Sequence, residues 1–217
     1  MRTHTRESQQ SMTPADALAY LREGNERFCA NLKANRNLLQ QVNDTRDGQY
    51  PFAAILSCID SRTSAELIFD QGLGDVFSIR IAGNFVNDDI LGSLEFACKA
   101  AGSKLVVVLG HSNCGAIKGA CDHVQLGHLT GMLAKIRPAV ESVREPQDAA
   151  LRNSRNETFV QAVADANVAL AVQQIRERST ILNELIHAGQ IGLVGGMYDL
   201  TSGKVEFQHG SGSLLGS

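Results

Sequence analysis

The chain has 217 residues, of which 43% are hydrophobic and 20% are charged, and its formal net charge is −3. This composition is typical of one soluble globular domain over residues 1–217 and excludes a disordered or fibrous chain. Because there is no basic stripe, nucleic acid is not expected as a partner. There is no apolar run of 18 residues and no signal-peptide core near the start, so we expect no membrane partner and a cytoplasmic location.

The two ends of the chain are expected to be irregular. Residues 1–12 are polar without periodicity, which predicts a loose N-terminal arm. Thr13 and Pro14 then offer an N-cap and a first helical residue, and the apolar stripe behind them predicts a helix over about 14–33. At the other end, the Gly- and Ser-rich residues 210–217 are expected to fray.

The middle of the chain alternates between short apolar runs and helical segments, of which about 86–101 is the clearest. Such runs are typical of parallel strands that are buried on both faces and joined by crossover helices. A mostly helical stretch and a final strand pair around a Gly-containing turn follow. We therefore predict an α/β fold with a mostly parallel β-sheet and flanking helices, with strands at 52–57, 76–81, 104–110, 191–198 and 204–208.

Two short motifs directly follow two of these runs. Cys58-Ile-Asp60-Ser-Arg62 comes after the first, and His111-Ser-Asn-Cys114 comes after the third. The carboxyl ends of strands are where open α/β sheets bind ligands. Two thiolates and one imidazole are the ligands of a catalytic Zn²⁺ with an open fourth position. We therefore predict one Zn²⁺ per chain, bound by Cys58, His111 and Cys114.

The charged residues of the first motif have a further use. An ion pair between Arg62 and Asp60 would keep the carboxylate ionised, oriented as an acceptor and away from the metal. Two other interpretations are open: the pair could be merely structural, or Asp60 could itself be the fourth ligand. A rival zinc set would comprise Cys121, His123 and His128, perhaps with Cys114, but no strand pair flanks these residues. Five cysteines are an odd number, which argues against a complete disulfide framework.

These motifs carry a family resemblance. The pattern C-x-D-x-R followed by H-x-x-C resembles the signature of the β-class carbonic anhydrases. The resemblance implies a zinc-dependent reversible hydration of CO₂ to bicarbonate and a proton, in which zinc hydroxide attacks CO₂ and Asp60 with Arg62 orients the zinc-bound oxygen. It also implies the β-carbonic anhydrase-like fold, because it spans nearly the whole chain through Leu21–Phe28, Arg80–Asn84, Gly92–Phe96 and Gly195–Lys204.

The resemblance further implies a substrate pocket. By position, Gln49 would be a side-chain donor to substrate oxygen, Phe77 and Phe96 would be apolar walls, and Gly115 would be a backbone N–H donor. In this family the pocket is built across a dimer interface and the N-terminal helix packs on the neighbouring subunit, so we expect a homodimer or a dimer of dimers. Thr63 departs from the family, in which a branched apolar residue is commoner, and the sequence offers no reason for it.

Two other functions remain open at this point. Enzymes of this fold with the same ligands also attack carbonyl sulfide or carbon disulfide, and the ligand motifs do not separate such a hydrolase from a carbonic anhydrase. A non-enzymatic zinc-bound protein of this fold is the other alternative. Such a protein would be expected to have lost Asp60, Arg62 or Gln49, and all three are present.

Overall fold

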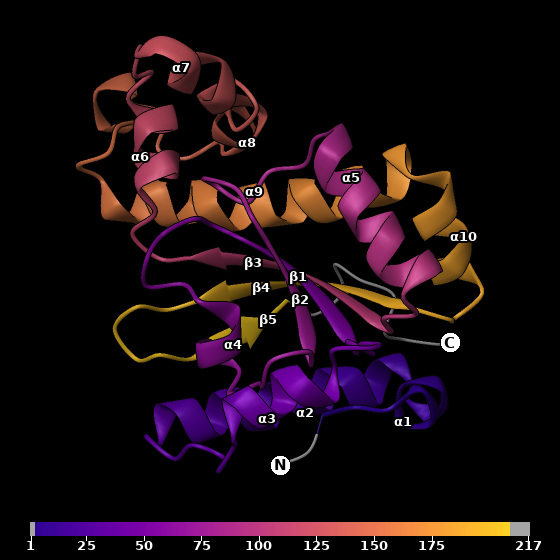
Figure 1. Ribbon diagram of the computed structural model, residues 1–217. Helices are drawn as coiled ribbons and strands as arrows, with labels where there is room; N and C mark the ends of the chain where they lie inside the picture. Colours follow the sequence, from indigo (N-terminus) through magenta and orange to yellow (C-terminus); the bar gives the residue numbers. More distant parts are fainter. Residues whose placement is uncertain (1–2, 209–217) are drawn as a thin grey trace.

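The computed structural model describes residues 3–208 and has a single sheet at its centre (Figure 1). The strand order is β2-β1-β3-β4-β5. The first four strands are parallel, and β5 is antiparallel to β4. This confirms the predicted α/β fold with a mostly parallel sheet. The strands are β1 (Ala53–Ser57), β2 (Val76–Arg80), β3 (Leu105–His111), β4 (Gly192–Tyr198) and β5 (Val205–Phe207).

Helices cover both faces of the sheet (Figure 1). One face carries α5 (Asp88–Glu95), its π-helical continuation η1 (Phe96–Ala100), α9 (Glu157–Arg178) and α10 (Thr180–His187). The opposite face carries α1 (Arg6–Ser11), α2 (Pro14–Cys29), α3 (Leu38–Asp44) and α4 (Ala65–Ile68). Between β3 and α9 the chain forms α6 (Gly115–Cys121), α7 (Gly127–Leu133), α8 (Arg137–Ser142) and the 3₁₀ turn η2 (Ala149–Leu151).

The strand order reverses between β1 and β3, which is where an open α/β sheet is expected to form a ligand-binding crevice. The chain passes from β1 to β2 on one side, whereas β3 pairs with β1 on the other side. At such a reversal the loops beyond the carboxyl ends of the two strands diverge and leave room for a ligand. Ser57 is opposite Leu109 in the sheet. Cys58, directly after β1, and His111, at the end of β3, therefore lie on either side of this crevice.

Burial differs between the central strands and β2. Every residue of β1 and β3 is buried, as continuous apolar runs predict for a sheet that is covered on both faces. The same prediction is wrong for β2, in which Phe77 and Ile79 are half-buried and Ser78 and Arg80 are exposed. The reason is its position, because β2 is an edge strand with β1 as its one partner in the sheet.

Over its described part, residues 3–12, the predicted loose arm contains a helix. Arg6–Ser11 form α1, whose N-cap is Thr5 in a reciprocal capping box with Ser8. Gln9 is buried and donates hydrogen bonds from its side-chain amide to the carbonyls of Pro51 (2.8 Å) and Ala101 (2.9 Å). A single buried glutamine leaves no apolar periodicity, so the sequence pattern did not indicate this helix. The predicted tail at 210–217 lies outside the described residues.

Helix α2 packs on the sheet of its own chain, and its predicted packing on a neighbouring subunit stays a prediction. Its apolar stripe, Ala17, Leu18 and Leu21, belongs to the core cluster beneath β1 and β3. A Cβ atom at Gly24 would overlap the carbonyl oxygen of Phe69, so glycine allows this close approach. Asn25 then donates to the carbonyls of Ile68 (3.1 Å) and Gly203 (2.9 Å). The segment Leu21–Phe28 therefore fastens the helix to its own domain.

Over residues 3–208, no helix combines the length and the apolar character that are needed to cross a bilayer.

Candidate metal centre and active site

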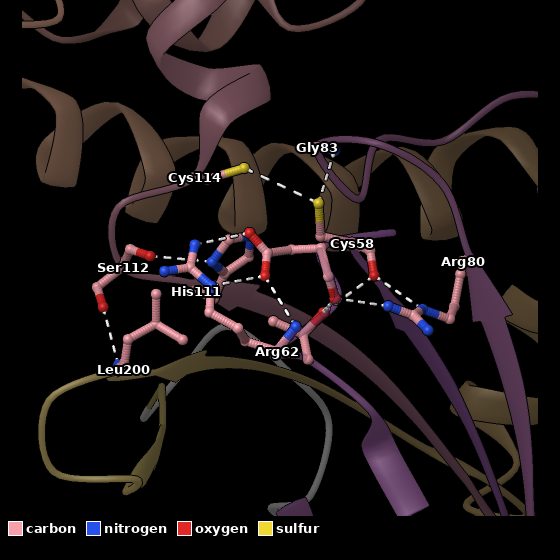
Figure 2. A network of polar contacts seen from close by, with 10 residues as sticks. Cys58, Arg62, Arg80, Gly83, His111, Ser112, Cys114 and Leu200 are labelled. Atoms are coloured by element: carbon pink, nitrogen blue, oxygen red, sulfur yellow. Dashed lines mark hydrogen bonds and ion pairs between the residues drawn. The ribbon is translucent and has the colours of Figure 1, made fainter.

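Three predicted ligands meet at the crevice between β1 and β3 (Figure 2). Cys58 follows β1, His111 ends β3, and Cys114 is the N-cap of α6. All three are buried, and their ligand atoms lie within 4.8 Å of one another. Within the described part of the chain, this is the one group of three or more His, Cys, Asp or Glu side chains whose ligand atoms lie close enough together to hold a metal ion. The rival set around Cys121 is not brought together, and Asp60 is not part of the group.

The spacing and the histidine orientation both fit a zinc ion. Tetrahedral zinc with Zn–S bonds of about 2.3 Å sets its two sulfurs about 3.8 Å apart, and the two Sγ atoms here are 4.0 Å apart. His111 Nδ1–H donates to the carbonyl of Ser112 (2.9 Å), and its Nε2 is buried without a hydrogen-bond partner. A buried, unpartnered imidazole nitrogen is costly unless it binds a ligand. The Nε2 lone pair is therefore available to a metal.

The residue that orients His111 is itself held in place. The Ser112 N–H donates to the carbonyl of Tyr198 (2.9 Å), and Ser112 Oγ accepts from the N–H of Leu200 (2.9 Å). These bonds tie the His111–Ser112 segment to the end of β4 and the loop after it, as Figure 2 shows for Leu200. The imidazole ring consequently has a fixed tautomer and direction.

The two thiols share one proton when no metal is bound. The hydrogen bond from the Cys114 thiol, together with smaller contributions from His111 and the Gly83 N–H and against the effect of burial, lowers the pKa of Cys58 to about 4. The same contact with Cys58, together with burial, raises the pKa of Cys114 far above its usual range. A divalent metal held by these residues would replace the shared proton and let both sulfurs be thiolates, because metal binding and proton release are coupled.

Asp60 and Arg62 form a forked ion pair beside this group. Arg62 Nε donates to Oδ1 (2.9 Å), Arg62 Nη2 donates to Oδ2 (2.8 Å), and the Arg62 backbone N–H also donates to Oδ1 (3.0 Å). These hydrogen bonds from Arg62, together with the nearby charge of His111, hold the pKa of Asp60 well below its usual range, although partial burial opposes the shift. The carboxylate is therefore ionised, acts only as an acceptor and is turned toward Arg62.

Three further residues hold the loop after β1, and sequence reasoning had assigned them no role. Arg80 donates to the carbonyls of Cys58 (Nε, 3.0 Å) and Asp60 (Nη2, 2.7 Å). Thr63 Oγ1 lies 3.0 Å and 2.9 Å from the same two carbonyls. The Gly83 N–H donates to Cys58 Sγ (3.4 Å). The one sequence signal that could have indicated a role for Arg80 was its position, as a charged residue at the end of an apolar strand. Thr63, the unexplained departure from the family, is buried because it caps this loop from inside.

Thr63→Val should weaken the loop without removing it. Valine keeps the shape of the side chain but cannot donate to the Cys58 or Asp60 carbonyl, which costs about 1 kcal/mol of unfolding free energy. Because Arg80 still holds both carbonyls, metal binding should survive. Chemical denaturation and zinc content of the purified variant check this expectation. A variant as stable as the parent would show that the hydroxyl contributes nothing there.

Of the four residues predicted to bind substrate, Gly115 lies next to a metal ligand, and the other three do not join the polar network of the metal group. Gly115 is the first residue of α6, so its N–H lies at a helix N-terminus next to Cys114. Phe77 on β2 and Phe96 at the start of η1 contact each other, with ring centroids 6.2 Å apart at 68°. Phe96 is 60% exposed, and Gln49 is exposed. As far as the chain is described, the polar network of the metal group includes none of Gln49, Phe77 and Phe96.

Comparison with known proteins gives the same answer as the geometry. The sequence profile of the carbonic anhydrase family matches residues 53–205. Carbonic anhydrase 2 of Mycobacterium tuberculosis is 36% identical over 206 residues, which cover 93% of this chain and 96% of that protein.

Solved structures agree on the fold. The β-carbonic anhydrase CafA of Aspergillus fumigatus has a TM-score of 0.67 and 26% identity, and the match covers 90% of each chain. A structure from Sordaria macrospora, described as one of two tetrameric β-carbonic anhydrases, has a TM-score of 0.66 and 21% identity, with 80% of this chain and 91% of that chain covered. The chain therefore belongs to the β-carbonic anhydrase family and is a carbonic anhydrase.

Proposed function

We propose that this carbonic anhydrase hydrates CO₂ reversibly to bicarbonate and a proton at one zinc ion, held by Cys58, His111 and Cys114. The observation that carries the proposal is the buried, unpartnered Nε2 of His111, a residue whose ring offers a ligand atom within 4.8 Å of both sulfurs. The ionised Asp60–Arg62 pair beside them supplies the acceptor that the reaction needs.

When bound, zinc lowers the pKa of a coordinated water from about 15.7 toward neutrality. The other steps depend on the side chains of Asp60 and Arg62. Asp60 accepts a hydrogen bond from the attacking water and turns its lone pair toward CO₂. Arg62 holds both carboxylate oxygens, so Asp60 stays ionised and does not turn onto the metal. Bicarbonate leaves when water takes its place, and the proton passes to buffer.

The test of the function is a direct comparison of two substrates on one sample. Stopped-flow CO₂ hydration and carbonyl sulfide hydrolysis should be measured with the same zinc-loaded protein near neutral pH. We expect rapid CO₂ hydration that dominates over sulfide hydrolysis. Efficient carbonyl sulfide hydrolysis with negligible CO₂ hydration would instead assign the chain to the hydrolase alternative.

We also propose that the substrate pocket is completed by a second copy of the chain. Two observations support this. Among the described residues no strand pairs with the outer edge of β2, and Phe96 beside it is a large apolar side chain that is 60% exposed. An exposed edge strand with apolar neighbours is an unfavourable free surface for a monomer. In a dimer, Gln49, Phe77 and Phe96 of one copy would face the metal site of the other.

Phe96→Asp should separate the copies and reduce activity. A carboxylate buried at an apolar interface is costly, so the sedimenting species should become smaller and CO₂ hydration should fall by about tenfold or more. Leu126→Asp is the matched control, because Leu126 is similarly exposed (66%) but lies at the start of α7. It should change neither property. A fully active monomer in sedimentation under assay conditions would overturn the proposal of a shared pocket.

A further inference from the structure

One buried polar side chain near the metal centre has no place in the mechanism above. Asn167 is in the middle of α9 and is 2% exposed. Its helical neighbours on the same side, Val163, Ala164, Val168 and Ala171, are all buried and apolar. An amide in such surroundings is costly unless it is hydrogen-bonded. The Asn167 side-chain amide donates to the carbonyl of Gly83, at 2.8 Å.

Gly83 links this amide to the metal group. While its carbonyl accepts from Asn167, its N–H donates to Cys58 Sγ at 3.4 Å, as Figure 2 shows. Gly83 has a φ of +79°, which glycine adopts readily and other residues rarely do. A Cβ at this position would also press against the side chains of Ile136 and Ala116. Residue 83 is therefore held from both sides, with its N–H directed at the sulfur.

We propose that Asn167 is a positioning residue for the metal centre, and that it acts by fixing the Gly83 N–H on the Cys58 thiolate. The inference rests on the proposed metal site. Asn167 touches neither metal nor substrate. Its effect comes through the hydrogen bond to sulfur, which stabilises the buried thiolate and reduces the charge that it donates. With two thiolates among three ligands, that reduction keeps the metal a stronger Lewis acid. Outer-shell partners of this kind are worth about 10–100-fold in metal affinity or activity.

The experiment compares Asn167→Leu with Val172→Ala. Leucine branches at the same carbon as asparagine and is larger, but it has no donor, so the Gly83 carbonyl loses its hydrogen bond. Val172 is buried on the same helix, and its truncation loosens core packing without a polar link to the metal group. Zinc affinity is measured by competition with a chromophoric chelator. The thiolate-to-metal charge-transfer band of the Co²⁺-substituted proteins is recorded separately, and neither measurement uses activity.

We expect Asn167→Leu to bind zinc about 10–100-fold more weakly and to shift the charge-transfer band to longer wavelength, because the sulfur regains electron density. Val172→Ala should lower thermal stability and leave both readouts unchanged. Should the leucine variant fail to fold, the smaller Asn167→Ala replaces it, since alanine also has no group that can donate to the Gly83 carbonyl. Zinc affinity within twofold of the parent and an unshifted band would overturn the role of Asn167. Failure of the parent protein itself to bind zinc at this group would overturn the proposed function instead.

Discussion

Cys58→Ser should yield a protein without bound zinc and without CO₂ hydration. A neutral hydroxyl is a far poorer zinc ligand than a thiolate, so zinc affinity should fall by at least about a hundredfold. The environment of Cys58 strengthens the expectation, because it is built for an anionic sulfur. The thiol of Cys114 and the N–H of Gly83 both direct hydrogen toward it, and they help to bring the pKa of Cys58 to about 4.

The measurement is zinc content by elemental analysis, together with stopped-flow CO₂ hydration. Cys98→Ser is the matched control, because Cys98 is also a buried cysteine but lies in η1, where burial raises the pKa of its thiol to about 12. That variant should be less stable and should keep one zinc per chain. Full zinc occupancy in Cys58→Ser would show that the ligand assignment is wrong.

Arg62→Ala should reduce CO₂ hydration by about 10²-fold while zinc stays bound. None of the three ligands is changed, so the zinc affinity should not fall. The loss comes from Asp60, whose carboxylate no longer has a fixed direction and is free to turn onto the metal. Arg46→Ala is the control, because Arg46 and Asp47 form an exposed ion pair (3.1 Å) with no contact to the metal group. If Arg62→Ala hydrated CO₂ as fast as the parent protein, the Asp60–Arg62 ion pair would have only a structural role.

The pH dependence separates loss of orientation from protonation. Arg62 is the main reason that the pKa of Asp60 lies well below its usual range. Removing Arg62 should let that pKa rise toward the ordinary value of about 3.9, which is still far below assay pH. A lowered carboxyl pKa matters only as pH falls through it, so Asp60 remains ionised in both proteins between about pH 6 and 9. The loss in Arg62→Ala should therefore be of similar size at both ends of this range. A loss confined to the acidic end would mean that protonation is the cause.

The sequence predicted the sheet and the grouping of Cys58, His111 and Cys114, for a physical reason. β1 and β3 are central strands, so both faces are buried and their apolar runs are continuous. The ends of such runs can be placed within a residue or two, and Cys58 and His111 sit at those ends. The ligand group then follows from topology, because parallel neighbours end at the same edge of the sheet.

The cytoplasmic location stays a prediction.

The parts that the sequence did not predict depend on polar contacts over long distances. Gln9 bonds to Ala101, Arg80 bonds to Cys58, and Asn167 bonds to Gly83. Each is a single polar residue whose partner lies 22 to 92 positions away, and no local periodicity records such a pairing. The apolar stripe of helix α2 indicates burial but does not say which surfaces bury it, so its packing on a neighbouring subunit stays a prediction.

A crystal structure at neutral pH, with anomalous diffraction measured at the zinc edge, tests the central claim most directly. The account predicts one zinc peak per chain, bonded to Cys58 Sγ, His111 Nε2 and Cys114 Sγ. It also predicts that the Asp60 carboxylate remains on Arg62 and that the fourth position is open to water or a small anion. A zinc peak elsewhere in the chain, or Asp60 bonded to the metal at neutral pH, would contradict it.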